Sequence, residues 1–280
     1  MSTPNQEYVQ RFGLLPRFLH FLVIVSFLTL AVTGMALKFA AEEWAGAVAE
    51  LFGSFEVLGN LHRFCAVITF TYFGLNLFLL WQNWQKSGKS FIGFILDPEG
   101  LVPSAHDVKE LVSTYKWFLG LGPQPRYGRW TYWEKFDYMA VFWGVAVIGS
   151  TGLCLWFPET FTQIIPGYWL NIATIIHSDE ALLASGFIFT IHFFNTHLRP
   201  EKFPMDPVIF TGTVPLDELI HERPREYDQL VASGQLEQVK CPPAPRWLFV
   251  TAHFFGLTAL TIGVALVLSI IYTMIFVYAK

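Results

Sequence analysis

Five apolar runs, each close to the ~20 residues needed to cross the hydrocarbon core of a bilayer, constrain this chain more than any other feature. They cover roughly residues 17–38, 57–82, 136–157, 169–198 and 247–279. Composition agrees, because 53% of the residues are hydrophobic and 14% are charged, whereas soluble domains average about 25% charged residues. The sequence therefore predicts an all-α membrane protein in which residues 1–280 form a single transmembrane domain, a five-transmembrane-helix bundle.

Lys and Arg are concentrated in two of the four connections between these runs. Seven lie in residues 83–135 and six in residues 199–246, whereas the other two connections contain five Glu and only Lys38 as a basic residue. Because basic residues are retained on the cytoplasmic side of a membrane, the two basic segments are predicted to be cytoplasmic loops. The same rule puts the N-terminus in the cytoplasm and the C-terminus outside. The protein is predicted to be a multi-pass protein of the cell inner (cytoplasmic) membrane. The net charge of −4 gives no indication of a nucleic-acid partner.

Four histidines, His20, His62, His177 and His192, lie in the apolar runs. An ionisable side chain inside a span is energetically costly and by default indicates a functional site. One such histidine alone is as often a structural residue at a helix interface, but chance would scatter most histidines into the polar loops. Neutral imidazole is the commonest metal ligand and a standard axial ligand of haem iron. These four residues are therefore predicted to be haem iron axial ligands.

The direction of each span predicts how the four histidines pair. The first span starts inside and puts His20 near the inner face, whereas the second starts outside and puts His62 near the outer face. The fourth span runs as the second does, so His177 is level with His62 and His192 is level with His20. On a straight helix His177 and His192 lie ~22 Å apart along the axis and within ~60° of one another. Two haems b are expected, an outer one held by His62 and His177 and an inner one held by His20 and His192.

Cysteines and arginines add to this expectation. Cys65, Cys154 and Cys241 are far apart and no C-x-x-C-H motif occurs, so neither a disulfide framework nor covalently attached haem is expected. Any iron–sulfur cluster must belong to a partner. Arg17 and Arg63 each lie close in sequence to a candidate ligand and are predicted to pair with haem propionates. Ordinary snorkelling at a helix end is the alternative for both.

The chain contains a weak internal sequence repeat. Thr33–Gly34 near the end of the first span matches Thr151–Gly152 in the third, and a similar offset aligns His62 with His177. The two halves are thus similar to two related helix hairpins. One Thr-Gly pair and one histidine are few matches, so chance similarity stays an alternative.

A short amphipathic helix is predicted in the second connection, at His106–Gly122. Leu111, Tyr115, Phe118 and Leu119 fall on one side of it, and glycines follow its end. Such a helix is expected to lie on the inner membrane surface. The fourth connection is Pro-rich and charged, and is predicted to be a cytoplasmic extension.

Several segments together carry a resemblance to a known family. They are RFLH at Arg17–His20, Thr33–Gly34, GNLHR at Gly59–Arg63, RYGRWTYWEKFDY at Arg126–Tyr138, and His177 with His192. Over roughly residues 11–200 the chain resembles the membrane cytochrome b subunits of the formate dehydrogenase gamma and hydrogenase b-type cytochrome superfamily. The segment His192–Asp206, HFFNTHLRPEKFPMD, also looks like diheme cytochrome b subunits that accompany multihaem cytochromes c.

This resemblance implies a function and a set of ligands. The family's ligand pattern, one histidine from each of the first two spans and two from a later span, falls on His20, His62, His177 and His192. In the family the two ligands on one helix are typically a residue closer than here. The implied function is a diheme b-type cytochrome, an electron-transfer subunit of a membrane quinone oxidoreductase complex. It would bind two haems b, exchange electrons with a quinone, and dock a peripheral Fe-S or multihaem cytochrome c subunit.

A second group of polar residues gathers at the predicted inner end of the bundle. Its members are His197, Asn195, Arg199 and His253, with Glu134 and Asp137 as candidates for a proton path. A quinone needs hydrogen-bond donors for its carbonyl oxygens and a proton path once it is reduced, so these residues are candidates for a quinone site. His197 and His253 are alternatively structural residues at the membrane interface, or a third haem pair.

Two other classes of membrane protein compete with this interpretation. A polytopic transporter with functional histidines would need broken helices with paired Gly or Pro interruptions near the midplane, and these are not evident. A membrane metalloenzyme of the di-metal oxygenase or desaturase type would need histidines clustered at one depth. The sequence contains neither an H-x-x-H-H nor an H-x-x-x-H box.

Overall fold

The protein contains five helices long and apolar enough to cross a membrane, in a computed structural model that describes residues 6–277. They are Leu14–Lys38, Phe55–Ser87, Tyr132–Trp156, Tyr168–Leu198 and Arg246–Val277. All five match the predicted spans with small shifts at their ends, while residues 278 and 279 of the last predicted span lie outside the described residues. The all-α bundle of a multi-pass membrane protein, as the sequence predicted, is confirmed.

The chain divides into two compact units, which are described separately. Unit 1 comprises Met1–Arg17, Leu77–Val141 and Pro207–Val250, and unit 2 comprises Phe18–Asn76, Phe142–Asp206 and Thr251–Lys280. Unit 2 holds most of each of the five spans. The four candidate haem ligands are all in unit 2.

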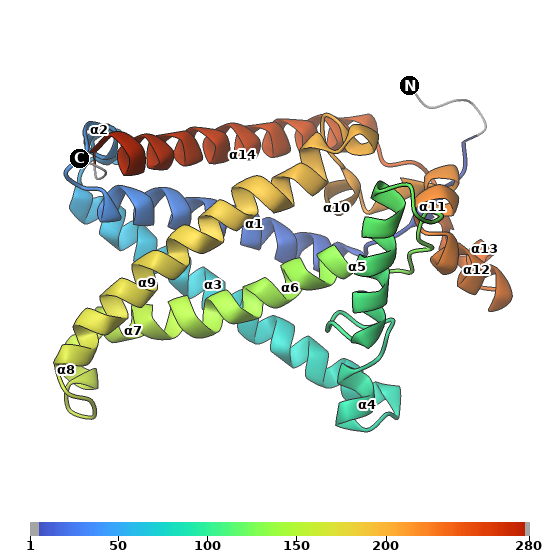
Figure 1. The fold of residues 1–280 in the computed structure, drawn as a ribbon, viewed down its shortest axis with the longest axis horizontal. Helices are drawn as coiled ribbons and strands as arrows, with labels where there is room; N and C mark the ends of the chain where they lie inside the picture. Colours follow the sequence, from blue (N-terminus) through green and yellow to red (C-terminus); the bar gives the residue numbers. More distant parts are fainter. Residues whose placement is uncertain (1–5, 278–280) are drawn as a thin grey trace. The chain divides into compact units, whose positions relative to one another are not determined.

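The spans, most of whose residues lie in unit 2, appear in Figure 1 as long helices. The third and fourth spans contain π-helical segments and the fifth ends in one, whereas the first and second are α-helical throughout. The elements are α1 (Leu14–Lys38), α2 (Glu43–Phe52), α3 (Phe55–Ser87), α6 (Tyr132–Gly144), η1 (Val145–Gly149), α7 (Ser150–Trp156), α8 (Pro158–Phe161), α9 (Tyr168–Phe187), η2 (Ile188–His192), η3 (Phe194–Leu198), η4 (Pro200–Lys202), α14 (Arg246–Tyr272) and η5 (Thr273–Val277). Helices are expected here because a backbone in lipid has to satisfy its polar groups within the segment itself.

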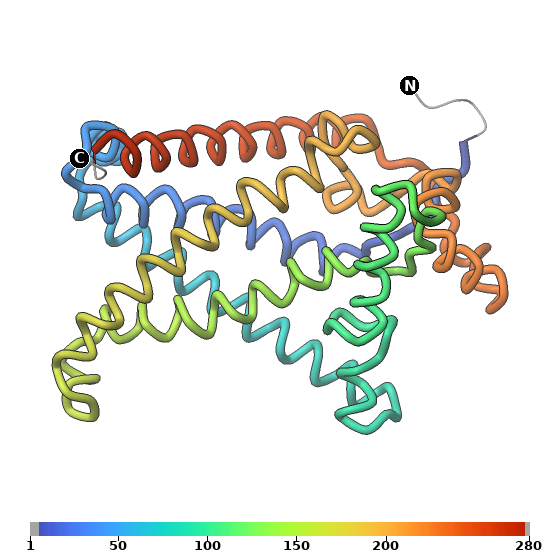
Figure 2. The backbone as a smooth tube through the Cα atoms, viewed as in Figure 1, coloured from blue at the N-terminus to red at the C-terminus, as the bar shows by residue number. Residues whose placement is uncertain are grey.

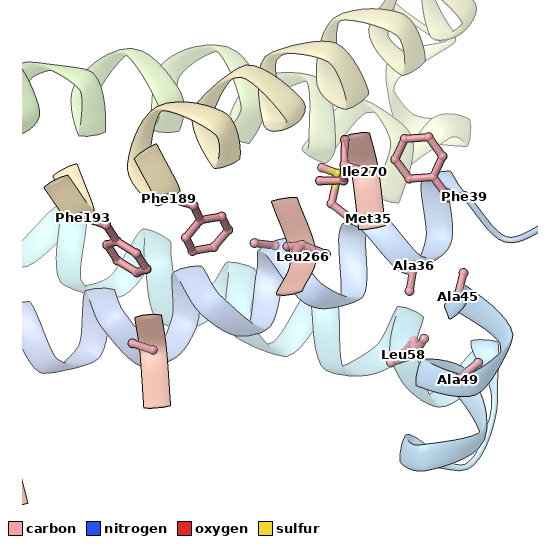
Figure 3. Close-up of a cluster of buried hydrophobic side chains, with 12 residues drawn as sticks. Met35, Ala36, Phe39, Ala45, Ala49, Leu58, Phe189, Phe193, Leu266 and Ile270 are labelled. Atoms are coloured by element: carbon pink, nitrogen blue, oxygen red, sulfur yellow. The ribbon is translucent and has the colours of Figure 1, made fainter. Parts of the chain in front are cut away.

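The packed interior of unit 2 is made of small and apolar side chains that point toward one another (Figure 3). Its members include Met35, Ala36, Ala45, Ala49, Leu58, Phe189, Phe193, Leu266 and Ile270. Gly263 allows α14 to approach the fourth span closely, because a Cβ at this position would lie 2.5 Å from Phe189 Cδ1 and 2.7 Å from Phe193 Cε2. The glycine therefore lets two aromatic rings of the fourth span pack directly against the fifth.

Helix α2 is a short connection between α1 and α3, and its course is visible in Figure 2. It ends at Gly53, whose φ of 111° is a left-handed conformation that glycine adopts without a steric penalty. Trp44 of α2 donates a hydrogen bond from Nε1 to Thr273 Oγ1 at 3.0 Å. This connection is therefore fixed to the end of the fifth span.

Unit 1 contains a three-stranded antiparallel sheet that the sequence analysis did not predict. Strand β1 (Tyr8–Gln10) lies between β2 (Thr213–Pro215) and β3 (Lys240–Cys241). The strands have two or three residues each, which is too short for an alternating hydrophobic pattern to be recognised. The N-terminal segment is thereby joined to the fourth connection of the chain.

The remaining elements of unit 1 are short helices. They are α4 (Phe91–Ile95), α5 (Ala105–Phe118), α10 (Val208–Thr211), α11 (Leu216–Glu222), α12 (Pro224–Ala232) and α13 (Leu236–Val239). The fourth connection, predicted only as a charged Pro-rich extension, is thus largely ordered by secondary structure. The amphipathic helix predicted at His106–Gly122 is present as α5.

Buried and partly buried ion pairs join distant segments within unit 1. Arg11 Nη1 lies 2.8 Å from Glu226 Oε2, and Arg129 Nη1 lies 2.8 Å from Glu226 Oε1. Arg223 Nη2 lies 2.9 Å from Glu134 Oε1. Burial lowers the pKa of Arg223, but the carboxylates of Glu134, Glu226 and Glu222 together outweigh burial and the net pKa is raised. The guanidinium groups stay charged, so these pairs connect the N-terminal segment, the second connection and the fourth.

Helix α5 turns its polar side inward. Asp107, Glu110 and Thr114 are buried, whereas large apolar residues on the opposite side, including Tyr115 and Phe118, are exposed. Asp107 Oδ1 pairs at 2.9 Å with Lys135 Nζ, which also donates to the Pro98 carbonyl oxygen at 2.7 Å. Burial raises the pKa of Asp107, but the hydrogen bonds from Lys135 and Ser104 and the charge of Lys135 together outweigh it, and the pKa is below its ordinary value.

Replacing Lys135 by Met should destabilise unit 1 by about 3–5 kcal/mol, because it leaves a buried carboxylate without its cation. The side chain of Lys135 is 0% exposed, so water cannot take its place. Thermal or denaturant unfolding of the detergent-solubilised protein, followed by tryptophan fluorescence, measures the loss.

The matched control is Lys109→Met, because Lys109 is an exposed lysine of α5 itself. Its effect should stay within about 0.5 kcal/mol. Asp107 with its lowered pKa stabilises the fold above the ordinary pKa of an unfolded aspartate, and this stabilisation is lost as pH falls through the folded value. Equal unfolding midpoints for the two lysine variants would show that the Lys135 pair does not matter.

Candidate functional site

The four histidines of the spans form two pairs in unit 2. The imidazole rings of His62, on α3, and His177, on α9, have centroids 6.2 Å apart with an interplanar angle of 73°. The rings of His20, on α1, and His192, at the end of η2, have centroids 6.5 Å apart with an interplanar angle of 51°. These are the pairs that topology and depth predicted from the sequence. All four side chains are partly buried.

The ring spacing in both pairs suits one metal ion between two imidazoles. A metal–imidazole bond is ~2 Å long and the ring centre lies ~1.2 Å beyond the nitrogen, so two rings on opposite sides of an ion have centres roughly 6.4 Å apart. The observed separations are 6.2 and 6.5 Å. The donor set, two neutral nitrogen ligands per site, is also the one that a low-spin haem iron takes. The residues present therefore fit bis-histidine haem at both positions.

His62 is held by the facing end of α1. Thr33 Oγ1 lies 3.0 Å from His62 Nδ1, and a backbone hydrogen bond joins the His62 ring to Leu30. Gly34, the residue after Thr33, leaves space for the ring, because a Cβ there would lie 3.1 Å from His62 Cε1. The ring edge therefore rests directly on the α1 backbone.

His177 is held in the same manner by α7 and η1. Thr151 Oγ1 lies 3.4 Å from His177 Nδ1, and the Ile148 carbonyl oxygen lies 2.9 Å from the same nitrogen. A Cβ at Gly152 would lie 2.9 Å from His177 Cε1. The weak internal sequence repeat thus corresponds to two copies of one local geometry, a Thr-Gly pair that faces a histidine ring. The repeated Thr-Gly pair was the sequence signal, although sequence analysis assigned no role to it.

The fourth span departs from the straight helix that the sequence analysis assumed. After α9 ends at Phe187, residues Ile188–His192 and Phe194–Leu198 are π-helical. A π-helical turn holds one residue more than an α-helical turn, so a segment of this kind absorbs an extra residue between His177 and His192. This gives a physical reason why a spacing one residue longer than that of the resembled family still brings both histidines to their partners.

His197 lies near the pair formed by His20 and His192. It is 6% exposed, and a backbone hydrogen bond joins its ring to Pro204. Its Nδ1 atom is buried without a hydrogen-bond partner in the described part of the chain. Its ring is close enough to His192 and His253 to interact with both electrostatically. A straight α-helix would separate His192 and His197 by ~140°, but in a π-helical segment residues five apart return toward one side.

The glycine of α14 next to this cluster is also closely packed. A Cβ at Gly256 would lie 2.5 Å from Met205 Sδ and 3.3 Å from His197 Cε1. Asn195 lies in η3 with His197, and Arg199 follows that segment directly. Arg199 Nε lies 3.5 Å from Glu201 Oε2.

The two arginines expected beside haem propionates are in different surroundings. Arg17 belongs to unit 1, where it donates a hydrogen bond from Nη2 to the Phe210 carbonyl oxygen. Arg63 is exposed and donates to Asn60 Oδ1 at 3.3 Å. Of the two residues suggested for a proton path, Glu134 is engaged by Arg11 and Arg223.

The acidic residues that follow His177 are paired. Asp179 Oδ1 and Ser178 Oγ both lie 2.9 Å from Lys38 Nζ, at the end of α1. Glu180 Oε2 accepts a hydrogen bond from Trp143 Nε1 at 3.1 Å. The fourth span is therefore connected, just after His177, to the end of the first span and to the third span.

Comparison with known proteins identifies the family. The family model described as prokaryotic cytochrome b561 matches residues 11–198, which is more than half of the 280 residues. No curated protein matches the chain. The matched segment contains both histidine pairs and both Thr-Gly pairs, and it confirms the resemblance to membrane b-type cytochromes. The chain belongs to the prokaryotic cytochrome b561 family of membrane b-type cytochromes.

Proposed function

We propose that this protein carries electrons across the membrane through two haems b, between a quinone/quinol pool and a peripheral redox protein. Family membership establishes the coarser part, a membrane b-type cytochrome that binds haem b and takes part in electron transfer with redox partners. The observation that carries the finer proposal is the pair of ring separations, 6.2 Å for His62 and His177 and 6.5 Å for His20 and His192.

Each histidine pair has a simple task in this mechanism. Haem b, when bound, supplies a reversible one-electron iron couple. His62 and His177 would hold one such group from α3 and α9, and His20 and His192 would hold the other from α1 and η2. Because every ligand comes from a rigid span, the ligand set changes little between oxidation states, and little reorganisation accompanies the transfer of an electron.

Replacing single ligands should remove one haem at a time. His177→Ala is expected to remove mainly the haem held with His62, and His20→Ala mainly the haem held with His192. Haem iron per purified chain should fall from two to one in each case. The absorption and EPR spectra of the remaining haem should differ between the two variants, because a different site is left.

His221→Ala is the matched control, since His221 is an exposed histidine of unit 1. It should keep both haems. The pairing is wrong if both ligand variants lose the same haem, and the diheme assignment is wrong if the unaltered chain contains one haem iron. A chain without reducible Soret and alpha bands would instead agree with a transporter.

We place the protein in the cell inner membrane with residues 83–135 and 199–246 in the cytoplasm. The thirteen Lys and Arg residues of these segments support this orientation. The N-terminus is then cytoplasmic and the C-terminus outside. A peripheral Fe-S or multihaem cytochrome c subunit would dock on the outside, over the haem held by His62 and His177.

Cysteine labelling tests this orientation. In a background without the native cysteines, Lys116→Cys and Ser233→Cys should resist an impermeant maleimide added to intact spheroplasts, whereas Glu50→Cys and Glu159→Cys should react. All four positions are exposed in the structure, so accessibility to the reagent reports the side of the membrane. Labelling of Lys116→Cys or Ser233→Cys from outside would reverse the orientation.

We place the quinone beside the inner haem, in contact with His197. The buried Nδ1 of His197 has no hydrogen-bond partner among residues 6–277, and a quinone carbonyl or hydroxyl supplies a suitable one. His253, Asn195 and Arg199 would complete the site as further hydrogen-bonding groups. A histidine close to His192 can also accept the proton that a quinol releases as its electron leaves.

His197→Leu should slow reduction of the haems by a quinol analogue by on the order of 100-fold, the usual loss when a proton-transfer group is removed. Both haems should be retained, as measured by the pyridine haemochrome spectrum. His221→Leu serves as the control, and its haems should be reduced by the quinol analogue at the normal rate. Unchanged rates and inhibitor affinity in His197→Leu would remove His197 from the site, and an inhibitor located near His177 would contradict the inner-side assignment.

A further inference from the structure

We propose that Thr33 and Thr151 are positioning residues that, together with the backbone carbonyls beside them, hold the rings of His62 and His177 with the proton on Nδ1, and that their hydroxyl groups tune the reduction potential of the haem that these histidines would bind. This inference rests on the proposed function, because it requires the two histidines to be axial ligands of one haem. It adds a role for residues outside the ligand set. The observations that carry it are the two hydroxyl–imidazole contacts and the backbone bonds that each hydroxyl already makes.

The hydroxyl proton of each threonine is already used. Thr33 Oγ1 donates to the Thr29 carbonyl oxygen at 2.6 Å, and Thr151 Oγ1 donates to the Val147 carbonyl oxygen at 2.6 Å. A hydroxyl group has one proton and two acceptor lone pairs. Toward the histidine each oxygen can therefore only accept, and the proton of the contact must be on Nδ1.

The backbone independently requires the same tautomer. The Ile148 carbonyl lies 2.9 Å from His177 Nδ1, and a carbonyl oxygen has no proton to give. Leu30, three residues before Thr33 as Ile148 is before Thr151, provides the backbone hydrogen bond of His62. Both rings are thus held with the proton on Nδ1 and the lone pair on Nε2, which is the form that binds a metal through Nε2.

The glycine after each threonine sets how closely the ring approaches. A Cβ would meet His62 Cε1 at 3.1 Å from Gly34, and His177 Cε1 at 2.9 Å from Gly152. Any side chain at these positions would push the ring away from its oxygen acceptors. The Thr-Gly pair therefore acts as one unit, in which the hydroxyl orients the ring and the glycine admits it.

Hydrogen bonding at Nδ1 changes the electronic character of the ligand. An Nδ1–H that donates to oxygen makes the imidazole a more basic ligand, and a more basic axial ligand favours oxidised over reduced iron. Two such ligands on one iron add their effects. The haem between His62 and His177 should therefore have a lower reduction potential than the same ligands would produce without the two hydroxyl groups.

The test is a redox titration of the full-length protein in detergent, with EPR of the oxidised haems as a second readout. Thr33→Val and Thr151→Val keep the side-chain shape and remove the acceptor. The reduction potential of the outer haem should rise by up to ~59 mV, which is about a tenfold change in its one-electron equilibrium in favour of the reduced form. Thr33→Val should have the larger effect, because Thr33 is nearer to its histidine (3.0 Å against 3.4 Å).

Matched variants separate this role from packing. Thr33→Ser keeps the hydroxyl and should restore the potential, whereas Thr71→Val removes an exposed hydroxyl of α3 that bonds only its own helix, at the Val67 carbonyl oxygen, and should change nothing. Gly152→Ala should alter the EPR g-values of the outer haem or release it. Gly74→Ala, where a Cβ meets nothing within 4 Å, should do neither.

Three results would overturn the inference. They are unchanged potentials and EPR spectra in both valine variants with full haem content, equal shifts of both haems, or a Thr33→Ser variant that behaves as Thr33→Val does. Loss of the outer haem in Thr33→Val but not in Thr33→Ser supports it. The ligand assignment is tested separately, because His177→Ala reports which haem is lost whatever the threonine variants do.

Discussion

An imidazole inside a bilayer has no water to bond to, so each of its two nitrogens needs a partner supplied by the protein or by a bound group. In this protein that requirement is met from two directions. The Nδ1 atoms of His62 and His177 face oxygen atoms of a neighbouring helix, which leaves each Nε2 for a metal. The ring separations within the two histidine pairs, 6.2 and 6.5 Å, match the spacing of two imidazoles on one metal ion, and they result from the way the spans pack.

The same device occurs in both helix hairpins of unit 2. In each, a Thr-Gly pair on the first helix faces a histidine on the second, and the carbonyl three residues before the threonine adds a further hydrogen bond. The repetition extends to the glycine, where the added Cβ would meet the same ring atom, Cε1, in both copies. The two hairpins therefore share a local atomic geometry as well as the short sequence matches.

The π-helical segments of the third and fourth spans lie beside residues of the histidine pairs and their contacts. The fourth span is π-helical at Ile188–His192 and again at Phe194–Leu198, which includes His197, and the third is π-helical at Val145–Gly149, which ends two residues before Thr151. Extra residues in a helix are thus taken up locally while the rest of the span stays α-helical. In unit 1 the equivalent constraint is electrostatic, because buried arginines and a buried lysine join segments that the sequence would suggest to be loops.

The sequence by itself determined the class of protein, the five spans and the four histidines, because hydrophobic length and a costly ionisable residue in a span are local signals. It also indicated the histidine pairs, since span direction and depth follow from counting. Only the tertiary structure decided that Thr33 and Thr151 contact the rings, that His197 lies by His192, and that unit 1 contains a sheet. Each of these depends on helix crossings, on π-helical turns or on pairing between residues more than 200 positions apart, such as Val9 with Val214, and no local pattern encodes them.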